Sequence, residues 1–360
     1  MKKKYIMRAL CPLLMSCLLL AGCGNHPDEK QNPGTTAEHA ATAESTAENT
    51  KTAASEESAE QTEPNEIVIN GKTYPLDIQE LTVSNVADLD QLRYATGLTS
   101  LTLLVNTDQA AVSWDWMEAL STVESLMIRV SGSKETDIDL RKLNGCKSLG
   151  ILSVQSSSRI TSLTIPSVSS LLRCEVALEA GADVLDASGC TGLTMLSLDG
   201  IAPDTLKIGD GLEQVICSCT AFDLTLLKKF PNVSRLSLYG TGWDLSQLEE
   251  TGVSKLTVQG GTADELKQLA GNAKLTALQV TDDTVTDISV AEELPALESL
   301  IIGVDPNQEN WNQLSEAAGQ PVQISEETLY LIETSVPLEQ LKSFMERGIQ
   351  VYMVSDLNRR

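Results

Sequence analysis

Residues that could carry covalent or metal chemistry are scarce in this chain of 360 residues. It holds eight cysteines and two histidines, and both histidines, His26 and His39, lie near the N-terminus. Nucleophilic catalysis of the Ser-His-Asp or Cys-His type needs a histidine as general base, so the later chain lacks these systems in their usual form. The sequence also has no glycine-rich phosphate loop, H-E-x-x-H motif or metal-spaced Cys/His cluster. We therefore expect no enzyme activity, no cofactor and no metal, with weak calcium binding at acidic turns and an unfamiliar enzyme site as open alternatives.

The remaining candidates are side chains that bind a partner rather than react with it. Arginine and tyrosine are over-represented at the energetic centres of protein interfaces. A few positive charges also stand out in a chain whose net charge is −24. The candidate partner-binding residues are Arg129, Arg173, Arg235, Tyr239, Lys255 and Gln259.

These candidates occupy related positions in a repeat of the form Leu-x-x-Leu-x-Leu, which returns about every 22 residues. The copies begin at Ile78, Leu98, Val123, Leu149, Leu171, Leu193, Leu212, Val233, Val253, Leu275 and Leu297. Side chains alternate along a strand, so the leucines of each copy point into a core and the intervening residues point away from it. The repeat predicts an α/β leucine-rich repeat solenoid, a horseshoe with a parallel sheet on its concave face and short helical or irregular returns.

The concave face is the side of the predicted sheet that points away from the core. Its central row is mostly small and hydroxylated, with Ser153, Ser197, Ser237 and Thr257 among its members. Solenoids commonly use this face for partners. An unoccupied, solvated sheet has the same composition, so a binding surface and a bare face are both open readings.

Two stretches resemble known repeat families. The segment from Val285 to Ile288, which runs on to Leu294 and Leu297, resembles the 22-residue repeat of the internalins. The segment Ser188–Leu193 resembles repeats of bacterial cell-surface leucine-rich proteins. The resemblance covers roughly residues 76–305 and implies a role in adhesion or recognition. The copies between residues 155 and 190 fit poorly, because Ile160, Leu163 and Ile165 offer a competing frame, and we expect irregular curvature or an extra loop there.

The repeat also predicts the state of five cysteines. Cys146 and Cys190 share a core-facing slot two repeats apart, near 10 Å at the spacing of adjacent strands and beyond disulfide reach. Cys174, Cys217 and Cys219 fall at inward strand positions. We expect buried thiols rather than a disulfide framework.

The N-terminus resembles the signal of bacterial lipoproteins. Four basic residues precede an apolar run that ends in Leu20-Ala21-Gly22-Cys23. The resemblance implies cleavage after residue 22 and lipidation of Cys23 with acyl chains such as palmitate, which places the protein on the extracytoplasmic face of the cell membrane. Cleavage would remove four basic and no acidic residues, so the net charge would change from −24 to −28. So acidic a chain repels nucleic acid, and its membrane contact depends on the lipid at Cys23.

The sequence predicts five regions in all. A signal peptide (1–22) precedes Cys23 and a disordered tether (23–66) that has ten acidic and two basic residues after Cys23. A hairpin cap (67–77) turns at Asn70-Gly71, where a type I′ turn is favoured. About 11 repeats follow (78–320), and a C-terminal cap (321–360) contains a helix over 338–347 and a strand over 349–354.

The function that follows from these features is recognition of a macromolecular partner, expected to be a protein, by a lipid-anchored surface protein. The alternatives are the substrate-binding lipoprotein of an importer and a purely structural envelope protein. An importer component needs two α/β lobes around an aromatic or charged pocket. The continuous repeat and an aromatic content of 4% argue against it.

Overall fold

A computed structural model describes residues 65–84, 89–109, 114–220, 222–280, 285, 287–303 and 338–354. All of them belong to a compact unit that spans residues Glu63–Arg360. The predicted signal peptide, Cys23 and residues 24–64 of the predicted tether lie outside the described residues. So do residues 304–337, which include the predicted boundary between the repeats and the C-terminal cap.

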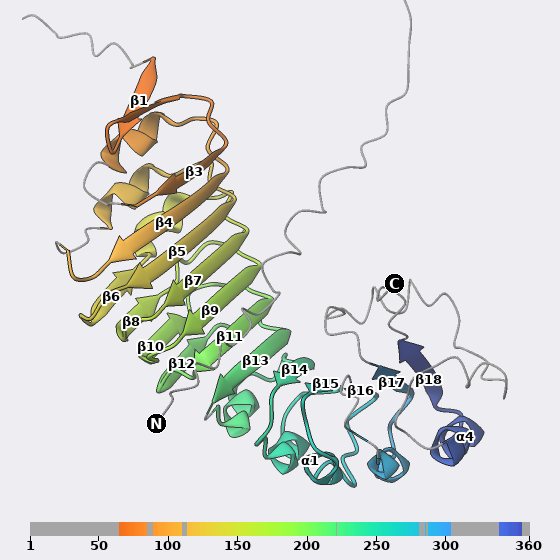
Figure 1. Ribbon diagram of the computed structural model, residues 1–360. Coiled ribbons are helices and arrows are strands. Elements are labelled where there is room, and N and C mark those ends of the chain that lie inside the picture. The colour runs from red at the N-terminus through yellow and green to blue at the C-terminus, as the bar shows by residue number, and fades with distance from the viewer. Residues whose placement is uncertain are drawn as a thin grey trace, which may run out of the picture. The chain divides into compact units, whose positions relative to one another are not determined.

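The repeat copies form the strands of one 12-stranded parallel sheet, which we call the main sheet (Figure 1). Each of the 11 predicted copies contributes one strand, and a final strand joins the end of the sheet. In spatial order the strands are β3 (Glu80–Val83), β4 (Ser100–Asn106), β5 (Ser125–Ser131), β7 (Ile151–Ser156), β9 (Arg173–Leu178), β11 (Met195–Ile201), β13 (Gln214–Thr220), β14 (Arg235–Tyr239), β15 (Lys255–Gln259), β16 (Ala277–Val280), β17 (Ser299–Gly303) and β18 (Gln350–Val354). The protein is therefore a leucine-rich repeat solenoid.

The register of the main sheet places equivalent residues of successive copies side by side. Leu152 pairs with Cys174, and Cys174 pairs with Leu196, so the degenerate copy that begins at Leu171 is in register with its neighbours. The core-facing side chains of these strands are buried almost completely. Burying one leucine stabilises a fold by roughly 1.5–3 kcal/mol, and the repeat multiplies this contribution along the stack.

The prediction for residues 155–190 is wrong in its form. Instead of an irregular section, the return segments of this region build a second parallel sheet of four strands, in the order β6 (Thr136–Asp139), β8 (Ile160–Thr164), β10 (Ala182–Ala187) and β12 (Thr205–Ile208). The two competing frames are both real, because Leu171 precedes main-sheet strand β9 while Ile160 and Leu163 belong to β8. Each coil here, meaning one turn of the solenoid, contains one strand of each sheet. In the second sheet Leu163 pairs with Leu185, and both side chains are buried against the core.

Elsewhere the returns are short helices, as predicted. The 3-10 helices are η3 (Leu89–Tyr94), η4 (Asp115–Ala119), η5 (Arg141–Gly145), η6 (Leu224–Lys229), η7 (Leu245–Glu250) and η8 (Ser289–Glu293), and the α-helices are α1 (Ala263–Lys267) and α4 (Leu338–Glu346). Three tryptophans that lie outside the strands, Trp114, Trp116 and Trp243, are buried. Trp311 lies outside the described residues.

Both expected terminal elements are present. At the N-terminal end, β1 (Glu66–Ile69) and β2 (Lys72–Pro75) form an antiparallel hairpin. Its turn residues Asn70 and Gly71 have φ values of 53° and 71°, the left-handed backbone that a type I′ turn requires. At the other end, α4 ends beside Gly348, and β18 then pairs in parallel with β17.

Candidate functional site

The six predicted partner-binding residues all lie on main-sheet strands, with side chains alternating with the buried leucines. On β14, Leu236 and Leu238 are buried in the core, while Arg235 and Tyr239 flank them and are half-buried. Lys255 and Gln259 have the same positions on β15. The alternation of a strand therefore directs these side chains to the concave face.

The structure places four of the six residues as two lateral pairs at the two ends of β14 and β15. Arg235 is the direct register partner of Lys255, and Tyr239 is the register partner of Gln259. Neighbouring strands are about 4.8 Å apart, so each pair of backbones is in immediate contact. We call these four residues on β14 and β15 the β14–β15 cluster.

The other two candidates lie elsewhere on the concave face. Arg173 is on β9, three strands from β14 and so about 14 Å away. Arg129 is exposed on β5, five strands from β14 and about 24 Å away. The β14–β15 cluster therefore contains four of the six candidates, and Arg129 and Arg173 lie further along the sheet.

Three cations lie in one row across the main sheet, at equivalent positions of their strands, and their charged neighbours differ. Arg173, Arg235 and Lys255 occupy equivalent strand positions. Arg173 has its own counter-ion in Glu175, with 2.7 Å between Nε and Oε1, although the N–H is not aligned as in a hydrogen bond. Within the described part of the chain, no ion pair involves Arg235 or Lys255. Like charges placed side by side on adjacent strands are destabilising, so this pair is an electrostatic weakness that an anion would relieve.

The central row of the concave face is not solvated from β11 to β17. Ser197, Ser237 and Thr257 are buried, and Gln279 and Ile301 are only 1% and 3% exposed. The Thr257 hydroxyl donates to Gln279 Oε1 at 3.2 Å, and the Nε2 of Gln279 has no hydrogen-bond partner among the residues that the structure describes.

Gln279 and Glu175 are residues that the sequence reasoning did not select. Glu175 could have been found from its spacing, because a carboxylate two residues after Arg173 on one strand shares its face. Gln279 carried a weaker signal, a single amide in a row of hydroxyl and apolar residues. Leaving a buried amide without a partner costs roughly 1–3 kcal/mol, which makes this position a binding candidate.

The loop after Tyr239 is held by the carboxylate of Glu265, the third residue of α1. Its oxygens accept from the backbone N–H groups of Gly242, of Trp243 at 3.1 Å and of Thr262 at 2.6 Å. The Thr262 side chain in turn accepts from the Glu265 N–H, which completes a capping box. Burial opposes ionisation, but these hydrogen bonds together keep the pKa of Glu265 below its usual value. A helix start on one repeat therefore orders the loop beside the β14–β15 cluster.

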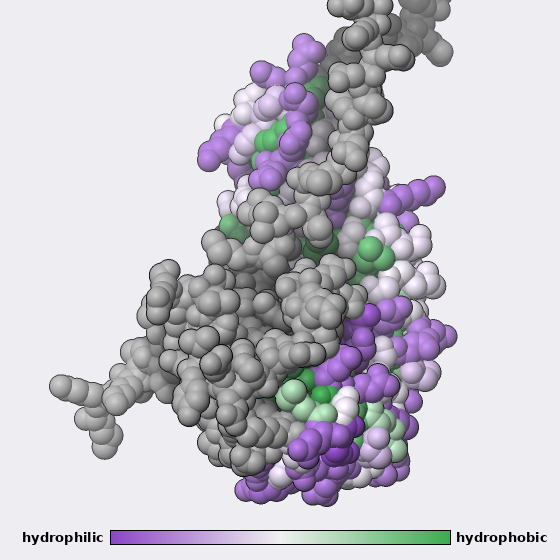
Figure 2. Space-filling view, turned by 90° about the vertical axis from the view of Figure 1, so that its right-hand side faces the viewer, coloured by the Kyte–Doolittle hydropathy of each residue, from purple (hydrophilic) through white to green (hydrophobic). Residues whose placement is uncertain are grey.

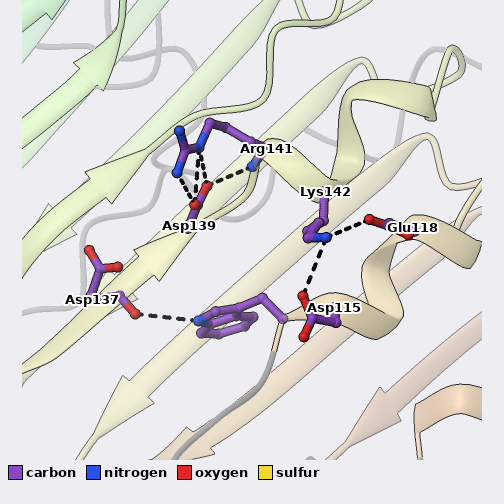
Figure 3. Close-up of polar contacts among 7 residues, drawn as sticks. Asp115, Glu118, Asp137, Asp139, Arg141 and Lys142 are labelled. Atoms are coloured by element: carbon purple, nitrogen blue, oxygen red, sulfur yellow. Dashed lines mark hydrogen bonds and ion pairs between the residues drawn. The ribbon is translucent and has the colours of Figure 1, made fainter.

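A second group of charges lies on the helical side and has a structural role (Figure 3). Lys142 of η5 reaches Glu118 at 2.6 Å and Asp115 at 3.4 Å, both on η4. Arg141 pairs with Asp139, which holds the pKa of that carboxyl below its usual range through a side-chain hydrogen bond. Exposed pairs of this kind contribute little to stability, and those of Lys142 join η5 to η4 of the preceding repeat.

The five cysteines of the described residues are free and buried, as the repeat register predicted. Burial raises the pKa of the Cys174 and Cys190 thiols, which suits small core residues. No group of three or more His, Cys, Asp or Glu side chains within the described ranges is placed to hold a metal ion. No helix in those ranges is long and apolar enough to cross a membrane.

One face of the surface is shown in Figure 2, where hydrophilic residues predominate and apolar ones form small, separate patches. Among the described residues, the large apolar side chains that are well exposed are Val68, Leu172 and Ile201. Single exposed apolar residues are ordinary on soluble domains. They do not add to the β14–β15 cluster.

No protein-family model and no curated protein matches this chain. Similar solved structures include an internalin (inlF) of Listeria monocytogenes, with 17% identity over 63% of this chain and 72% of that one and a TM-score of 0.26. Internalin C2 of the same bacterium has 16% identity, 64% and 79% coverage and a TM-score of 0.25. The TLR13 chain of a TLR13–ssRNA13 complex has 14% identity, 63% and 41% coverage and a TM-score of 0.26. The fold assignment rests on the strand register of the chain itself.

Proposed function

We propose that this protein binds another protein through the concave face of its solenoid while lipid at Cys23 holds it on the outer side of the cell membrane. The observation that supports binding is the β14–β15 cluster, in which two cations without a counter-ion among the described residues share two adjacent strands with a tyrosine and a glutamine. Arginine and tyrosine at such a site are typical anchors of protein interfaces.

Several features of the concave face support a protein partner rather than a nucleic acid. The cluster holds two cations, whereas the whole chain carries a net charge of −24. A nucleic-acid site needs positive charge spread over many phosphates. The parallel strands also display side chains in straight rows, which suits contact with another folded surface or an extended segment.

Affinity capture from cell-envelope, host and neighbouring-cell extracts tests this proposal, with residues 24–360 as bait. The described fold begins at residue 65, so the bait retains all of it. The comparison is between the wild type, Arg235→Ala/Tyr239→Ala and the control Lys147→Gln/Lys229→Gln, which changes two exposed lysines away from the strands. A protein retained by the wild type and the control but lost from the cluster variant supports the proposal. Equal retention by all three, or recovery of a small molecule alone, contradicts it.

The anchor is tested separately, because Cys23 lies outside the described residues. Cells expressing the full chain are labelled with an alkyne analogue of palmitate and fractionated. We expect label and membrane association in the wild type and the loss of both in Cys23→Ala. Label that persists in the variant would contradict lipidation at this residue.

A further inference from the structure

We propose that the β14–β15 cluster binds a carboxylate of the partner, an Asp or Glu side chain, held between Arg235 and Lys255. This inference rests on the proposed function, because it specifies what the concave face recognises. The supporting observation is that strand β9 differs from strands β14 and β15 in the residue that accompanies the cation.

Strand β9 shows which counter-ion can accompany a cation at this position of the repeat. Arg173 is followed two residues later by Glu175, and their Nε and Oε1 atoms lie 2.7 Å apart. The two side chains are 22% and 19% exposed, so the pair is largely shielded from water. The concave face therefore has room for a carboxylate at the central position of a strand, beside a cation two residues earlier on the same strand.

Strands β14 and β15 repeat the cation and omit the carboxylate. Where β9 has Glu175, β14 has Ser237 and β15 has Thr257, both of them small and neutral. Arg235 and Lys255 are direct lateral partners, so their charges repel each other with no acidic side chain between them. A carboxylate above Ser237 and Thr257 would take the place that Glu175 takes on β9, and it would contact two cations instead of one.

The buried amide of Gln279 adds a third group to this place. Gln279 follows Thr257 in the central row, on the next strand, and is 1% exposed. The amide Oε1 accepts from the Thr257 hydroxyl, and the Nε2 has no partner in the described part of the chain. Beside it, Ala277 offers no polar side-chain atom to satisfy that end. An Nε2–H directed to an incoming carboxylate would remove the unsatisfied donor.

Charge complementarity selects an acidic side chain as the occupant. Cation–carboxylate hydrogen bonds are about twice as strong as neutral ones, and they gain further where water is excluded. The negative charge of the rest of the chain repels a strongly acidic partner at long range. The site is therefore suited to isolated carboxylates on an otherwise neutral or basic segment.

The test uses two fluorescein-labelled peptides of eight residues, one with a single central Glu among serines (the Ser-Glu peptide) and one with a Gln in its place, with residues 24–360 of the protein. We expect the Ser-Glu peptide to bind the wild type at least about tenfold more tightly by fluorescence polarisation, and to weaken as salt is raised. The variant Arg235→Gln/Lys255→Gln should abolish the difference between the peptides. The control Lys147→Gln/Lys229→Gln removes the same charge elsewhere and should retain it.

A second variant, Ser237→Glu, copies the arrangement of β9 onto β14. It should fold, since β9 carries the same Arg-x-Glu pattern, and circular dichroism and thermal unfolding check this. Its own carboxylate should pair with Arg235 and exclude the Ser-Glu peptide. Equal affinity of the wild type for both peptides, no binding of either, or unchanged Ser-Glu binding by Ser237→Glu would overturn the carboxylate site. Partner capture that still depends on Tyr239 would leave the proposed function standing in that case.

Discussion

Glu265 allows a quantitative test of how one repeat orders the next. Its carboxylate accepts hydrogen bonds from the backbone N–H groups of Thr262, Gly242 and Trp243 and from the Thr262 hydroxyl. Glu265→Ala removes the reciprocal half of a capping box, worth about 1 kcal/mol. It also leaves the part-buried N–H of Trp243 without this acceptor, worth about another 1 kcal/mol. We therefore expect a loss of about 2 kcal/mol in the free energy of unfolding.

Two further variants separate charge from shape. Glu265→Gln keeps one acceptor oxygen without charge, and neutral hydrogen bonds are about half as strong, so we expect a loss near 1 kcal/mol. Asp264→Ala removes an exposed carboxylate of the same helix, whose ion pair within the described residues is with Lys267 at 3.4 Å, and it should leave stability nearly unchanged. Urea unfolding gives the free energies, and hydrogen exchange at the amides of Gly242 and Trp243 reads the loop directly.

The same contact predicts a pH dependence. The folded-state pKa of Glu265 lies below its usual value near 4.5, so its contribution is complete above that pH and is lost as pH falls through the folded pKa. The stability difference between the wild type and Glu265→Gln should therefore shrink below about pH 4.5. An equal loss in Asp264→Ala, unchanged exchange at Gly242 and Trp243, or a difference that grows in acid would refute the reasoning.

Three other perturbations test the fold. Leu163→Ala, in the second sheet, should lower the free energy of unfolding by about 2–5 kcal/mol in urea titrations. Thr161→Ala, at a half-buried position of the same strand, should have a small effect. Similar losses in the two variants would contradict a second buried layer. Gly200→Ala should be strongly destabilising by the same measurement, because its φ is +88° and an added Cβ would lie 2.3 Å from a backbone oxygen, while Gly145→Ala, with open space around it, should be tolerated. Native protein beginning at residue 24 should not react with a thiol reagent, and denatured protein should expose five thiols; fast labelling of the native state would disprove their burial. These thiols are Cys146, Cys174, Cys190, Cys217 and Cys219.

The pairing register of the main sheet was predictable because the spacing of the leucines determines it. A one-residue slip would turn Leu196 and Leu198 out of the core, so the leucine spacing determines the pairing even at the weak copy that holds Cys174. The hairpin at Asn70 and Gly71 was predictable for a similar local reason, since few residues other than these accept its turn geometry.

The second sheet was not predictable in the same way. The period stays near 22 residues whether a return segment is a helix or a strand, so the period does not separate the two. The alternation on β8 has only Ile160 and Leu163 as buried positions, too short a pattern to identify a strand by itself. The sequence did carry a sign of the second sheet, namely a second repeat frame that competed with the first. A coil with two strands produces two such frames.

The binding residues were predicted by type and position, but not by environment. Periodicity showed that Arg235 and Lys255 share a row, and the sheet confirms this. Alternation gives the direction of a side chain and not its exposure, so the burial of Gln279 and Ile301 could not be foreseen. The pairing of Arg173 with Glu175 could have been predicted from their two-residue spacing on one strand. This ion pair distinguishes Arg173 from Arg235 and Lys255.

The second sheet has a mechanical consequence if the protein is anchored at Cys23 and engages its partner at β14 and β15. Tension between these points would cross the strands of the main sheet one after another, pulling neighbouring strands apart rather than sliding them along each other. Between the coils that contain β6 and β12, each step has two ladders of backbone hydrogen bonds instead of one. These coils should therefore resist extension better than the coils closed by 3-10 helices, so that a stretched molecule would open first between β3 and β5 or between β13 and β15.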